Sequence, residues 1–460
     1  MNRKPNVLFI VVDDMGYGDF GVFGDGSPQT PRLDALVSDG CCFTQHYSGA
    51  PVCAPARAAL LTGRYALRTG VIDTQDANGL DRIHTDEQTV GDVFSRAGYA
   101  TGLIGKWHSG AYDPRYHPTR RGFSEFAGFQ GGWSDYYDFT LQVGRGTRRG
   151  TGEYMTDVLT QEALGFLERH QNESFFLSLN YNAPHFPFQA PAADVERFSH
   201  PEDAHPDLRT LYAMIYRMDE GLGRVLDKLR ELGLEEQTLV IFTSDNGPQM
   251  SPNVRRYNAR WAGSKGNVYE GGIRVPAAVR WPGRVEAGAM SDELVHFVDW
   301  LPTLASICDL PLHDLPAPLD GADVSTTLLD GRASYDGPRF WQWNRYEPVA
   351  RCNAAVRDGA WKLLYPEIDE AMQLSEHDIT TDKYFKAHPD EATHVVPALY
   401  ERNVPEPHPP QLYNLEADPY EEHDLAGREP ERTAALARRL ESWFEEVERE
   451  RTAKEQGYAR

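Results

Sequence analysis

Two pairs of adjacent residues in the sequence have the oxygen-bearing side chains that bind a hard cation. Asp13 and Asp14 follow the apolar run NVLFIVV, and Asp245 and Asn246 follow the run TLVIFTS. Adjacent carboxylates at the end of a buried strand repel each other unless a cation neutralises them. Together the pairs offer the oxygen ligands that Ca²⁺ and Mg²⁺ prefer, without the Cys and His spacing of a zinc site. Each pair alone would also fit a solvated turn, because Asp-Asn-Gly is common turn chemistry.

Four basic side chains are candidates for binding an oxyanion. Lys106 and His108 occur in GKWHSG, His185 in NAPHFP and Lys265 in AGSKG. Lys106 and His108 are two residues apart, so an extended backbone would point both side chains the same way. Each residue alone is better explained as a surface residue. Several of them at the ends of strands predict a polar site.

The segment SGAPVCAPARAALLTGRY places a cysteine at the expected start of a helix. Pro55 suits the first helical turn, and Gly63 suits the position after the last turn. Backbone N–H groups at such a start favour an anion, and Arg57 can bind a tetrahedral oxyanion through two hydrogen bonds. The same surroundings also suit a reactive cysteine, so a thiol nucleophile is an alternative interpretation.

Strand-length apolar runs alternate with helical periodicity over the first two thirds of the chain. Strands are expected at 6–12, 100–105, 175–182, 238–244 and 273–281, and helices at 30–40, with Thr30 as N-cap, and at 206–232. This alternation predicts an α/β fold with a mainly parallel central sheet flanked by helices. Ligands of such sheets bind at the carboxyl ends of the strands, which is where the candidate residues stand.

The last third of the chain has a different character. Short strand-like pieces, NAAVRDGAWKLLY and PQLYNLEADP, precede a closing amphipathic helix. Its apolar face is formed by Leu436, Leu440, Trp443, Phe444 and Val447. We therefore expect a catalytic domain over residues 1–335. Residues 336–460 should form a smaller C-terminal α+β subdomain with a small antiparallel sheet and a terminal helix.

Composition limits the classes of partner. The 460 residues include 46 basic and 69 acidic side chains, for a net charge of −23. Such a charge disfavours generic binding to nucleic acid or to anionic membranes. No run approaches the roughly 20 apolar residues of a transmembrane helix. We expect a cytoplasmic protein as the sequence is written, or a periplasmic or secreted one if an export signal has been removed.

The segment Cys53-Ala54-Pro55-Ala56-Arg57 resembles the Cys-x-Pro-Ser-Arg motif of the formylglycine-dependent type I sulfatases, which belong to the alkaline phosphatase superfamily. The resemblance continues through PNVLFIVVDDMGYGD, GKWH, NAPHFP, SDNG, GSKGNVYEGGIRVPAAVRWPG and QLYNLEADPYEEHDLA, and it spans most of the chain. Ala56 departs from the motif, because the family usually has serine there. The resemblance implies an alkaline phosphatase-like fold.

The resemblance also implies a mechanism. A formylglycine-generating enzyme would oxidise Cys53, and one hydroxyl of the hydrated aldehyde would attack the sulfur of a sulfated small molecule or saccharide. Loss of a proton from the second hydroxyl would then expel sulfate from the sulfated enzyme. The implied catalytic residues are Cys53, Arg57, Lys106, His108, His185 and Lys265. The implied ligands of Ca²⁺, or of Mg²⁺, are Asp13, Asp14, Asp245, Asn246 and the modified Cys53.

Within that mechanism, His108 would take the proton from the hydrate and His185 would protonate the leaving oxygen. Trp133, Tyr136 and Tyr137 would suit the rim of a sugar site, although core packing explains them equally well. The segment QWNRYEPVARCN could also reach the site. These features favour a sulfated carbohydrate as substrate. The alternatives are a phosphonate or phosphate ester hydrolase of the same superfamily and a non-catalytic glycan-binding descendant with unmodified Cys53.

Overall fold

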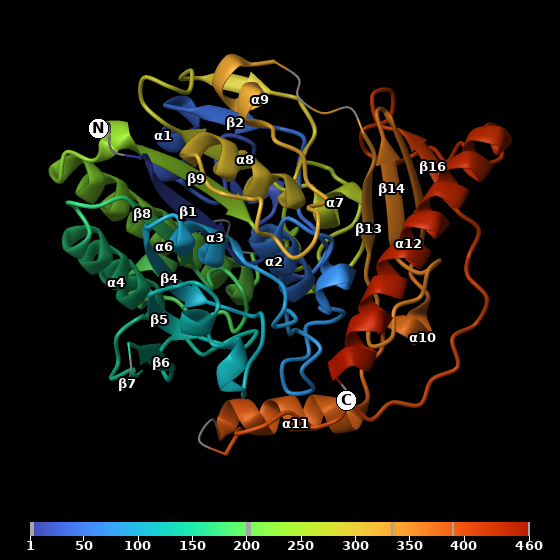
Figure 1. Cartoon of the computed structure of the whole chain (residues 1–460), viewed down its shortest axis with the longest axis horizontal. Helices are drawn as coiled ribbons and strands as arrows, with labels where there is room; N and C mark the ends of the chain where they lie inside the picture. The colour runs from blue at the N-terminus through green and yellow to red at the C-terminus, as the bar shows by residue number, and fades with distance from the viewer. Residues whose placement is uncertain are drawn as a thin grey trace.

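A ten-stranded sheet forms the centre of the molecule (Figure 1). The computed structural model describes residues 4–144, 146–198, 204–332, 335, 337–388 and 391–458. In order across the sheet, the strands are β11 (Ala289–Ser291), β2 (Cys41–Phe43), β10 (Ala277–Arg280), β9 (Thr238–Ser244), β1 (Asn6–Val12), β8 (Phe175–Asn180), β4 (Ala100–Lys106), β5 (Glu125–Phe129), β6 (Thr140–Val143) and β7 (Gly146–Arg149). The consecutive strands β9, β1, β8, β4 and β5 are parallel, which confirms the predicted mainly parallel sheet.

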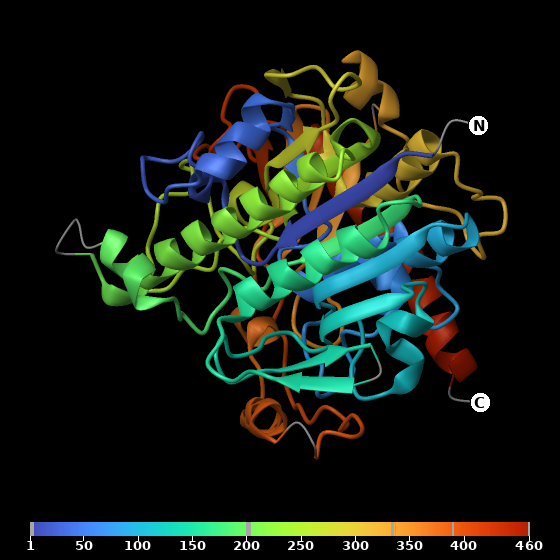
Figure 2. The ribbon, with the colours of Figure 1, turned by 90° about the vertical axis from the view of Figure 1, so that its left-hand side faces the viewer.

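Helices cover both faces of this sheet, because its central strands are apolar on both sides. Leu8, Ile10 and Val12 of β1 pack under α1 (Pro31–Ser38), α4 (Met155–Arg169) and α6 (Pro206–Glu231). Figure 2 shows α4 and α6 lying across that face. The intervening residues of β1 pack against α2 (Cys53–Thr62), α3 (Val90–Arg96) and α8 (Trp300–Cys308) on the other face. The remaining elements of this part are α5 (Ala192–Arg197), α7 (Glu270–Ile273), α9 (Ser325–Asp330) and the parallel pair β3 (His46–Tyr47) and β12 (Val295–His296).

Two local expectations need correction. Thr30 is the N-cap residue of α1 as predicted, but its hydroxyl donates to Asp34 (2.9 Å) and accepts no hydrogen bond from the first turn. The first-turn N–H groups of Arg32 and Leu33 donate instead to Asp219 of α6, which is 187 and 186 residues away in the chain. The strand expected at 273–281 is shorter and antiparallel to β9, since α7 occupies the chain as far as Ile273.

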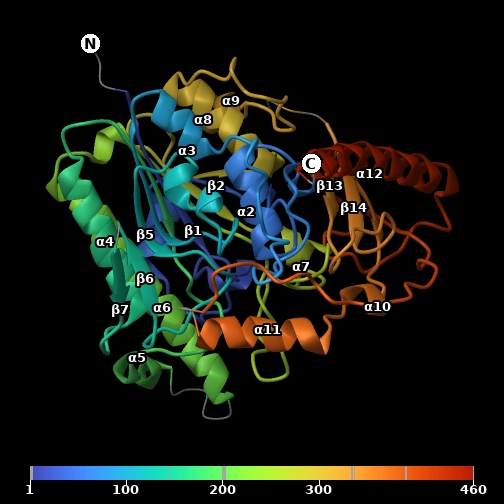
Figure 3. The same ribbon diagram turned by 60° about the horizontal axis from the view of Figure 1, so that its bottom comes forward.

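A separate four-stranded antiparallel sheet forms the C-terminal subdomain (Figures 1 and 3). It contains β13 (Arg339–Gln342), β14 (Ala354–Asp358), β15 (Trp361–Tyr365) and β16 (Gln411–Asn414), and α12 (Pro430–Tyr458) crosses it. Leu436, Leu440, Trp443 and Val447 are buried on the predicted face of α12. The predicted boundary near 335 falls in a stretch where residues 333, 334 and 336 lie outside the described residues.

The C-terminal subdomain also contains two shorter helices, α10 (Asp369–Met372) and α11 (Glu376–Ala387). Figure 3 shows α11 running beside the main part of the molecule. Asp378 accepts a hydrogen bond from Asn78 (3.1 Å), and Lys386 forms an ion pair with Asp76. Within the described part of the chain, no helix is long and apolar enough to span a membrane.

Candidate active site

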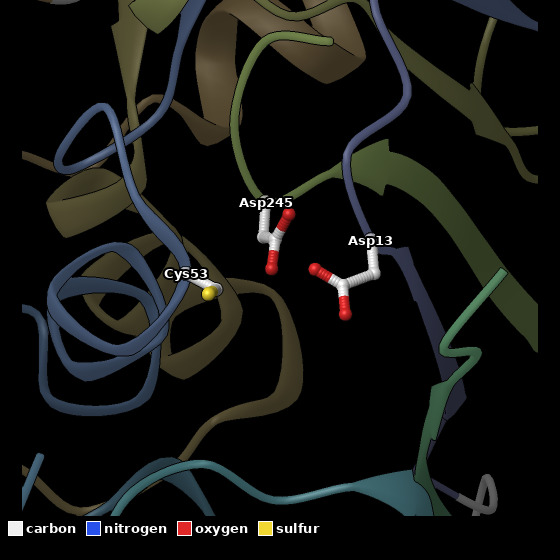
Figure 4. A group of neighbouring side chains, drawn as sticks. All are labelled: Asp13, Cys53 and Asp245. Carbon is white, nitrogen blue, oxygen red and sulfur yellow. The ribbon is translucent and has the colours of Figure 1, made fainter. Parts of the chain in front are cut away.

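The predicted acidic residues meet at one edge of the central sheet. β1 and β9 are parallel neighbours with Val12 opposite Ser244, so Asp13 and Asp245 leave the sheet side by side. Figure 4 shows their carboxylates pointing toward each other, with Cys53 across from them. Lys106 is the last residue of β4, and His185 follows the end of β8. The carboxyl ends of these parallel strands therefore bring the candidate residues together.

Each carboxylate of this site is paired with a predicted cation. Lys106 Nζ donates to Asp13 Oδ2 (2.6 Å), and Lys265 Nζ donates to Asp14 Oδ2 (2.7 Å). Arg57 donates to Asp245 Oδ2 through Nε at 2.9 Å, and its Nη2 lies 2.8 Å from the same oxygen. Three carboxylates and three cations are thus balanced before any ligand binds.

Cys53 begins α2, as the sequence predicts. The segment CAPARAALLT is rich in alanine, and Gly63 ends the helix with a φ of 67°, which glycine adopts readily. The side chain is buried, and Cys53, Asp13 and Asp245 each offer one ligand atom within 4.8 Å of the others. Arg57 lies one turn later on the same helix. An anion at Cys53 would therefore meet both the helix N-terminus and a guanidinium group.

Burial and neighbouring charge change the acidity of these groups in opposite directions. Burial raises the pKa of Asp13, although Lys106 opposes the change. Burial and the nearby Asp13 carboxylate raise the pKa of Asp245 to about 6. Burial also acts on Asp14, but Lys265 and His185 lower its pKa well below the usual value. A bound cation would favour the ionised form of all three carboxylates.

The site also has acceptor oxygens that could serve a metal ion. Asn246 donates through Nδ2 to Asp14 Oδ1 (2.8 Å), which leaves its own Oδ1 as an acceptor. Within the described residues, the buried oxygens Asn246 Oδ1 and Asp13 Oδ1 have no hydrogen-bond donor. Buried polar atoms are rarely left unsatisfied. The residues present therefore fit a hard cation bound by oxygen.

The backbone between Lys106 and His108 has a different conformation from the one predicted. Strand β4 ends at Lys106, and His108 has a φ of 49°, so the backbone is not extended between them. Its Nε2 donates to the Thr74 carbonyl (3.0 Å), and Nδ1 has no partner among the described residues. Burial, followed by Lys106, lowers the pKa of His108 to about 4. A neutral imidazole with Nδ1 as acceptor can accept a proton.

His185 has the opposite arrangement of its ring nitrogens. Nδ1 donates to the Phe186 carbonyl (2.7 Å), and Nε2 lies 3.7 Å from Asp14 Oδ2. Burial, followed by Lys265, lowers the pKa of His185, while Asp14 opposes the change. Tyr136, considered above for the rim of a sugar site, is fully buried and donates to the His185 carbonyl (2.9 Å). Tyr136 is therefore a support for the His185 loop.

Sequence reasoning missed several residues around His108. Asp73, Thr74 and Asp76 carry no motif, yet Asp76 and Asp81 both act on the pKa of His108. Arg345 of the C-terminal part donates to Asp73 Oδ1 and to Thr74 Oγ1, each at 2.8 Å. The segment QWNRYEPVARCN, which contains Arg345, is the one sequence signal that pointed to this region.

Comparisons with known proteins identify related sequences. A sequence profile described as Sulfatase matches residues 5–310, and one described as N-sulphoglucosamine sulphohydrolase, C-terminal, matches residues 260–385. The N-acetylgalactosamine-6-sulfatase of Mus musculus is 35% identical over 74% of this chain and 69% of its own length. The arylsulfatase A of Homo sapiens is 32% identical over 94% of this chain and 86% of its own.

Solved structures show the same fold. The crystal structure of Ps i-CgsB with k-i-k-neocarrahexaose has a TM-score of 0.80 and 29% identity, covering 96% of this chain and 93% of that chain. A phosphonate monoester hydrolase from Silicibacter pomeroyi has a TM-score of 0.65 and 21% identity, covering 97% and 96%. The second likeness concerns the fold alone.

Proposed function

The chain belongs to the sulfatase family of the alkaline phosphatase superfamily and is a sulfuric ester hydrolase; from that premise we propose that it removes sulfate from carbohydrates by means of a formylglycine formed from Cys53. The observation that carries the proposal is the position of Cys53. Its sulfur shares one buried group with the carboxylates of Asp13 and Asp245, at the N-terminus of α2. A thiol that only filled space would not need that setting.

Formylglycine explains why a cysteine is placed there. Its hydrated aldehyde supplies one hydroxyl that attacks sulfur and a second whose loss of a proton expels sulfate, whereas a cysteine or serine supplies only one such group. Modification by a formylglycine-generating enzyme would act on the motif residues Cys53, Pro55 and Arg57. Ala56, which stands in place of the usual serine, is fully buried in the apolar core. A serine there would need a buried partner for its hydroxyl.

We propose Ca²⁺ as the resident cation, with Mg²⁺ as the competing assignment. Asp13, Asp14, Asp245 and Asn246 would hold it, together with the modified Cys53. Ca²⁺ accepts many oxygen ligands in flexible geometry, which suits this set. When bound, the cation lowers the pKa of the nucleophilic hydroxyl and polarises a sulfate oxygen.

The cations of the site orient the sulfate group. Arg57, Lys106 and Lys265 converge on the carboxylates from α2, β4 and the loop before α7. They are held before substrate arrives, so stabilising the developing sulfuryl charge needs little rearrangement. Lys265, whose side chain is 17% exposed, is the one of the three that substrate can reach from solvent.

The two histidines have separate proton roles in this proposal. His108 accepts a proton at Nδ1, because its Nε2–H is fixed on the Thr74 carbonyl. His185 donates from Nε2 to the leaving oxygen, and this requires its protonated form. Asp14, at 3.7 Å, favours that form against the effect of burial. The pair thus divides proton removal and proton delivery between two elements.

A carbohydrate substrate is supported by the relatives. The printed names include an N-acetylgalactosamine-6-sulfatase, and a structure at 29% identity was solved with k-i-k-neocarrahexaose. Both names refer to sugars. We propose a sulfated saccharide for this chain in preference to a simple aryl sulfate.

The decisive experiment combines peptide mass spectrometry with turnover. Protein co-expressed with a formylglycine-generating enzyme would be analysed across residues 48–65. It would then be assayed on N-acetylgalactosamine 6-sulfate, k-i-k-neocarrahexaose, 4-nitrophenyl sulfate and 4-nitrophenyl phosphate, and its metal content would be measured. We expect the aldehyde at position 53, bound Ca²⁺ and release of sulfate from a saccharide. Faster turnover of the phosphate ester, or a retained thiol with saccharide binding but no turnover, would contradict the proposal.

A further inference from the structure

Trp343 and Arg345 lie between two residues of the proposed mechanism, Lys265 and His108. We propose that Trp343 and Arg345 are specificity-determining residues, whose N–H groups bind oxygens of the sugar that carries the scissile sulfate. The inference rests on the proposed function, because it names how the same site recognises its substrate. Neither side chain belongs to a strand or helix of the central sheet; both follow β13 of the C-terminal subdomain.

Trp343 lies on the Lys265 side. A Cβ atom placed on Gly266 would lie 3.9 Å from Cζ3 of the Trp343 ring. The Gly266 N–H donates to the Pro51 carbonyl (2.9 Å), two residues before Cys53. Trp343 is only 4% exposed, and its Nε1–H has no acceptor within the described ranges of the chain.

Arg345 lies on the His108 side. It donates through Nη1 to Thr74 Oγ1, and the carbonyl of the same threonine accepts the Nε2–H of His108. The Arg345 guanidinium carbon is 4.8 Å from the centre of the Trp343 ring, so the two side chains form one stacked unit. Arg345 Nε is buried and, as far as the described residues extend, has no acceptor. The side chain is 21% exposed, so a solute can reach it.

This stacked pair is held rigidly. Asn353 donates through Nδ2 to the carbonyls of Gly266 and Trp343, both at 2.8 Å, and the Trp343 N–H donates to the Asn353 carbonyl (3.1 Å). Asp73 Oδ1 fixes Arg345 at 2.8 Å, and Asp73 is itself fully buried. Donors that are already in place lose little conformational freedom when a ligand binds.

The chemistry of the pair indicates its ligand. Indole and guanidinium nitrogens donate hydrogen bonds and accept none. Two buried N–H groups without acceptors are therefore completed by a ligand rich in oxygen. A sugar held by its sulfate between Lys265 and His108 presents such oxygens as hydroxyl, carboxylate or further sulfate groups. The Asp73 carboxylate neutralises Arg345, which limits nonspecific attraction of anions and leaves hydrogen bonding as the basis of selection.

The test measures binding, so it does not depend on turnover. In a Cys53→Ala background, titration calorimetry would give the affinities for N-acetylgalactosamine 6-sulfate, k-i-k-neocarrahexaose and inorganic sulfate. Trp343→Phe keeps an aromatic ring but removes the indole N–H group together with the five-membered ring, and Arg345→Gln removes the guanidinium. We expect each change to lower the ratio of saccharide affinity to sulfate affinity about tenfold, the value of one lost hydrogen bond.

Matched controls are available in the same part of the chain. Arg351→Gln alters a half-exposed arginine paired with Glu441, and Trp361→Phe alters a tryptophan packed under Arg432. Both controls should leave the ratio unchanged, and thermal unfolding would confirm that all four variants are folded. An unchanged ratio in Trp343→Phe and Arg345→Gln would overturn the inference, because ordered water would then satisfy the two donors.

The two proposals fail differently in this design. Turnover of 4-nitrophenyl sulfate by the modified enzyme, without binding of either saccharide to the Cys53→Ala protein, would overturn the inference and leave the sulfatase chemistry standing. Saccharide binding that depends on Trp343 and Arg345, in a protein that releases no sulfate, would overturn the proposed function and support the inference.

Discussion

The reaction centre and the contact between α7 and the four-stranded sheet both bury several charges, but they satisfy them differently. At the contact, Lys362 Nζ lies 2.8 Å from both Glu270 Oε1 and Glu421 Oε1, and Tyr47 donates to Glu270 Oε2 (2.6 Å). We call Glu270, Lys362 and Glu421 the contact cluster. At the proposed reaction centre, Arg57 Nη2 lies 4.0 Å from Asp13 Oδ1, and neither this oxygen nor Glu421 Oε1 has a hydrogen-bond donor within the described residues.

This difference separates a structural role from a functional one. Burial of charge is common to both regions, so burial alone does not mark a site. The contact cluster places Lys362 between its two carboxylates and links α7 to β15, which fixes the subdomain against the main sheet. In our proposals, the acceptor oxygens of the reaction centre bind a cation, and the N–H groups of Trp343 and Arg345 bind a sugar. Substitutions in the contact cluster should lower the stability of the protein. Substitutions at the reaction centre should lower the reaction rate, and substitutions of Trp343 and Arg345 should change substrate selectivity.

The largest expected effect is a loss of catalytic rate. Cys53→Ala removes the group that becomes the nucleophile, so kcat should fall by at least about 10⁴-fold on every sulfate ester. The side chain is small and buried, so the unfolding temperature should change by a few degrees at most, as for a loss of about 1 kcal/mol. Initial rates and calorimetric unfolding would check both parts. Retention of more than a hundredth of the rate, about 10⁻², would mean that another residue is the nucleophile.

The next effect is on stability. Lys362→Met removes the cation between two buried carboxylates, and the free energy of unfolding should fall by about 3–5 kcal/mol. Arg439→Gln is the matched control, since its ion pair with Asp358 at 2.6 Å is 48% and 38% exposed. That variant should lose less than about 1 kcal/mol. Urea unfolding followed by fluorescence would compare them, and equal losses would show that the contact cluster does not hold the subdomain.

A smaller loss of activity is expected at Asn353, where the C-terminal subdomain contacts the Lys265 loop. Asn353 ties the C-terminal part to the Lys265 loop through Gly266 and Val268. Its φ is 46°, so Asn353→Gly removes the side chain without backbone strain. The loop would then hold Lys265 less firmly, and kcat should fall about tenfold with a loss of about 1–3 kcal/mol in stability.

Asn353→Asp is a second variant for this prediction. Aspartate keeps the acceptor for the Val268 N–H but turns a carboxylate oxygen toward the carbonyls of Gly266 and Trp343, so its kcat should be no higher than that of Asn353→Gly. Steady-state kinetics on 4-nitrophenyl sulfate would measure all three. A stability loss without any change in kcat would restrict Asn353 to a structural role.

The contrast between regions also explains what could be predicted from the sequence. Asp13, Asp245 and Lys106 stand at the ends of short apolar runs, and the sheet order places those ends together, so local patterns predicted that these residues would lie together. Arg345 and Asp73 are 272 residues apart and lie in loops without periodicity. Their pairing depends on how the subdomain packs against the main sheet, which no local pattern encodes. The turn at His108 was missed as well, since its φ of 49° is uncommon for a residue other than glycine and no local pattern indicates it.

The smallest expected effect is a pH dependence of the contact cluster. Burial raises the pKa of Glu421 to about 7, although Lys362 opposes the change, and Glu270 keeps its charge with a pKa of about 2. Because the folded protein holds the Glu421 proton more tightly than the unfolded chain, the stability from this proton is fully present below the usual glutamate pKa and is lost as pH rises through about 7.

Glu421→Gln mimics the protonated form at every pH and therefore removes this dependence. The free energy of unfolding of the wild type should fall relative to the variant by about 1 kcal/mol or more between pH 5 and pH 8, a difference set by the shift in pKa. Parallel urea titrations across that range would measure it. Parallel stability curves would mean that Lys362 holds both glutamates ionised. The contact cluster would then carry one excess negative charge at neutral pH and would resemble the reaction centre more closely than its closed geometry indicates.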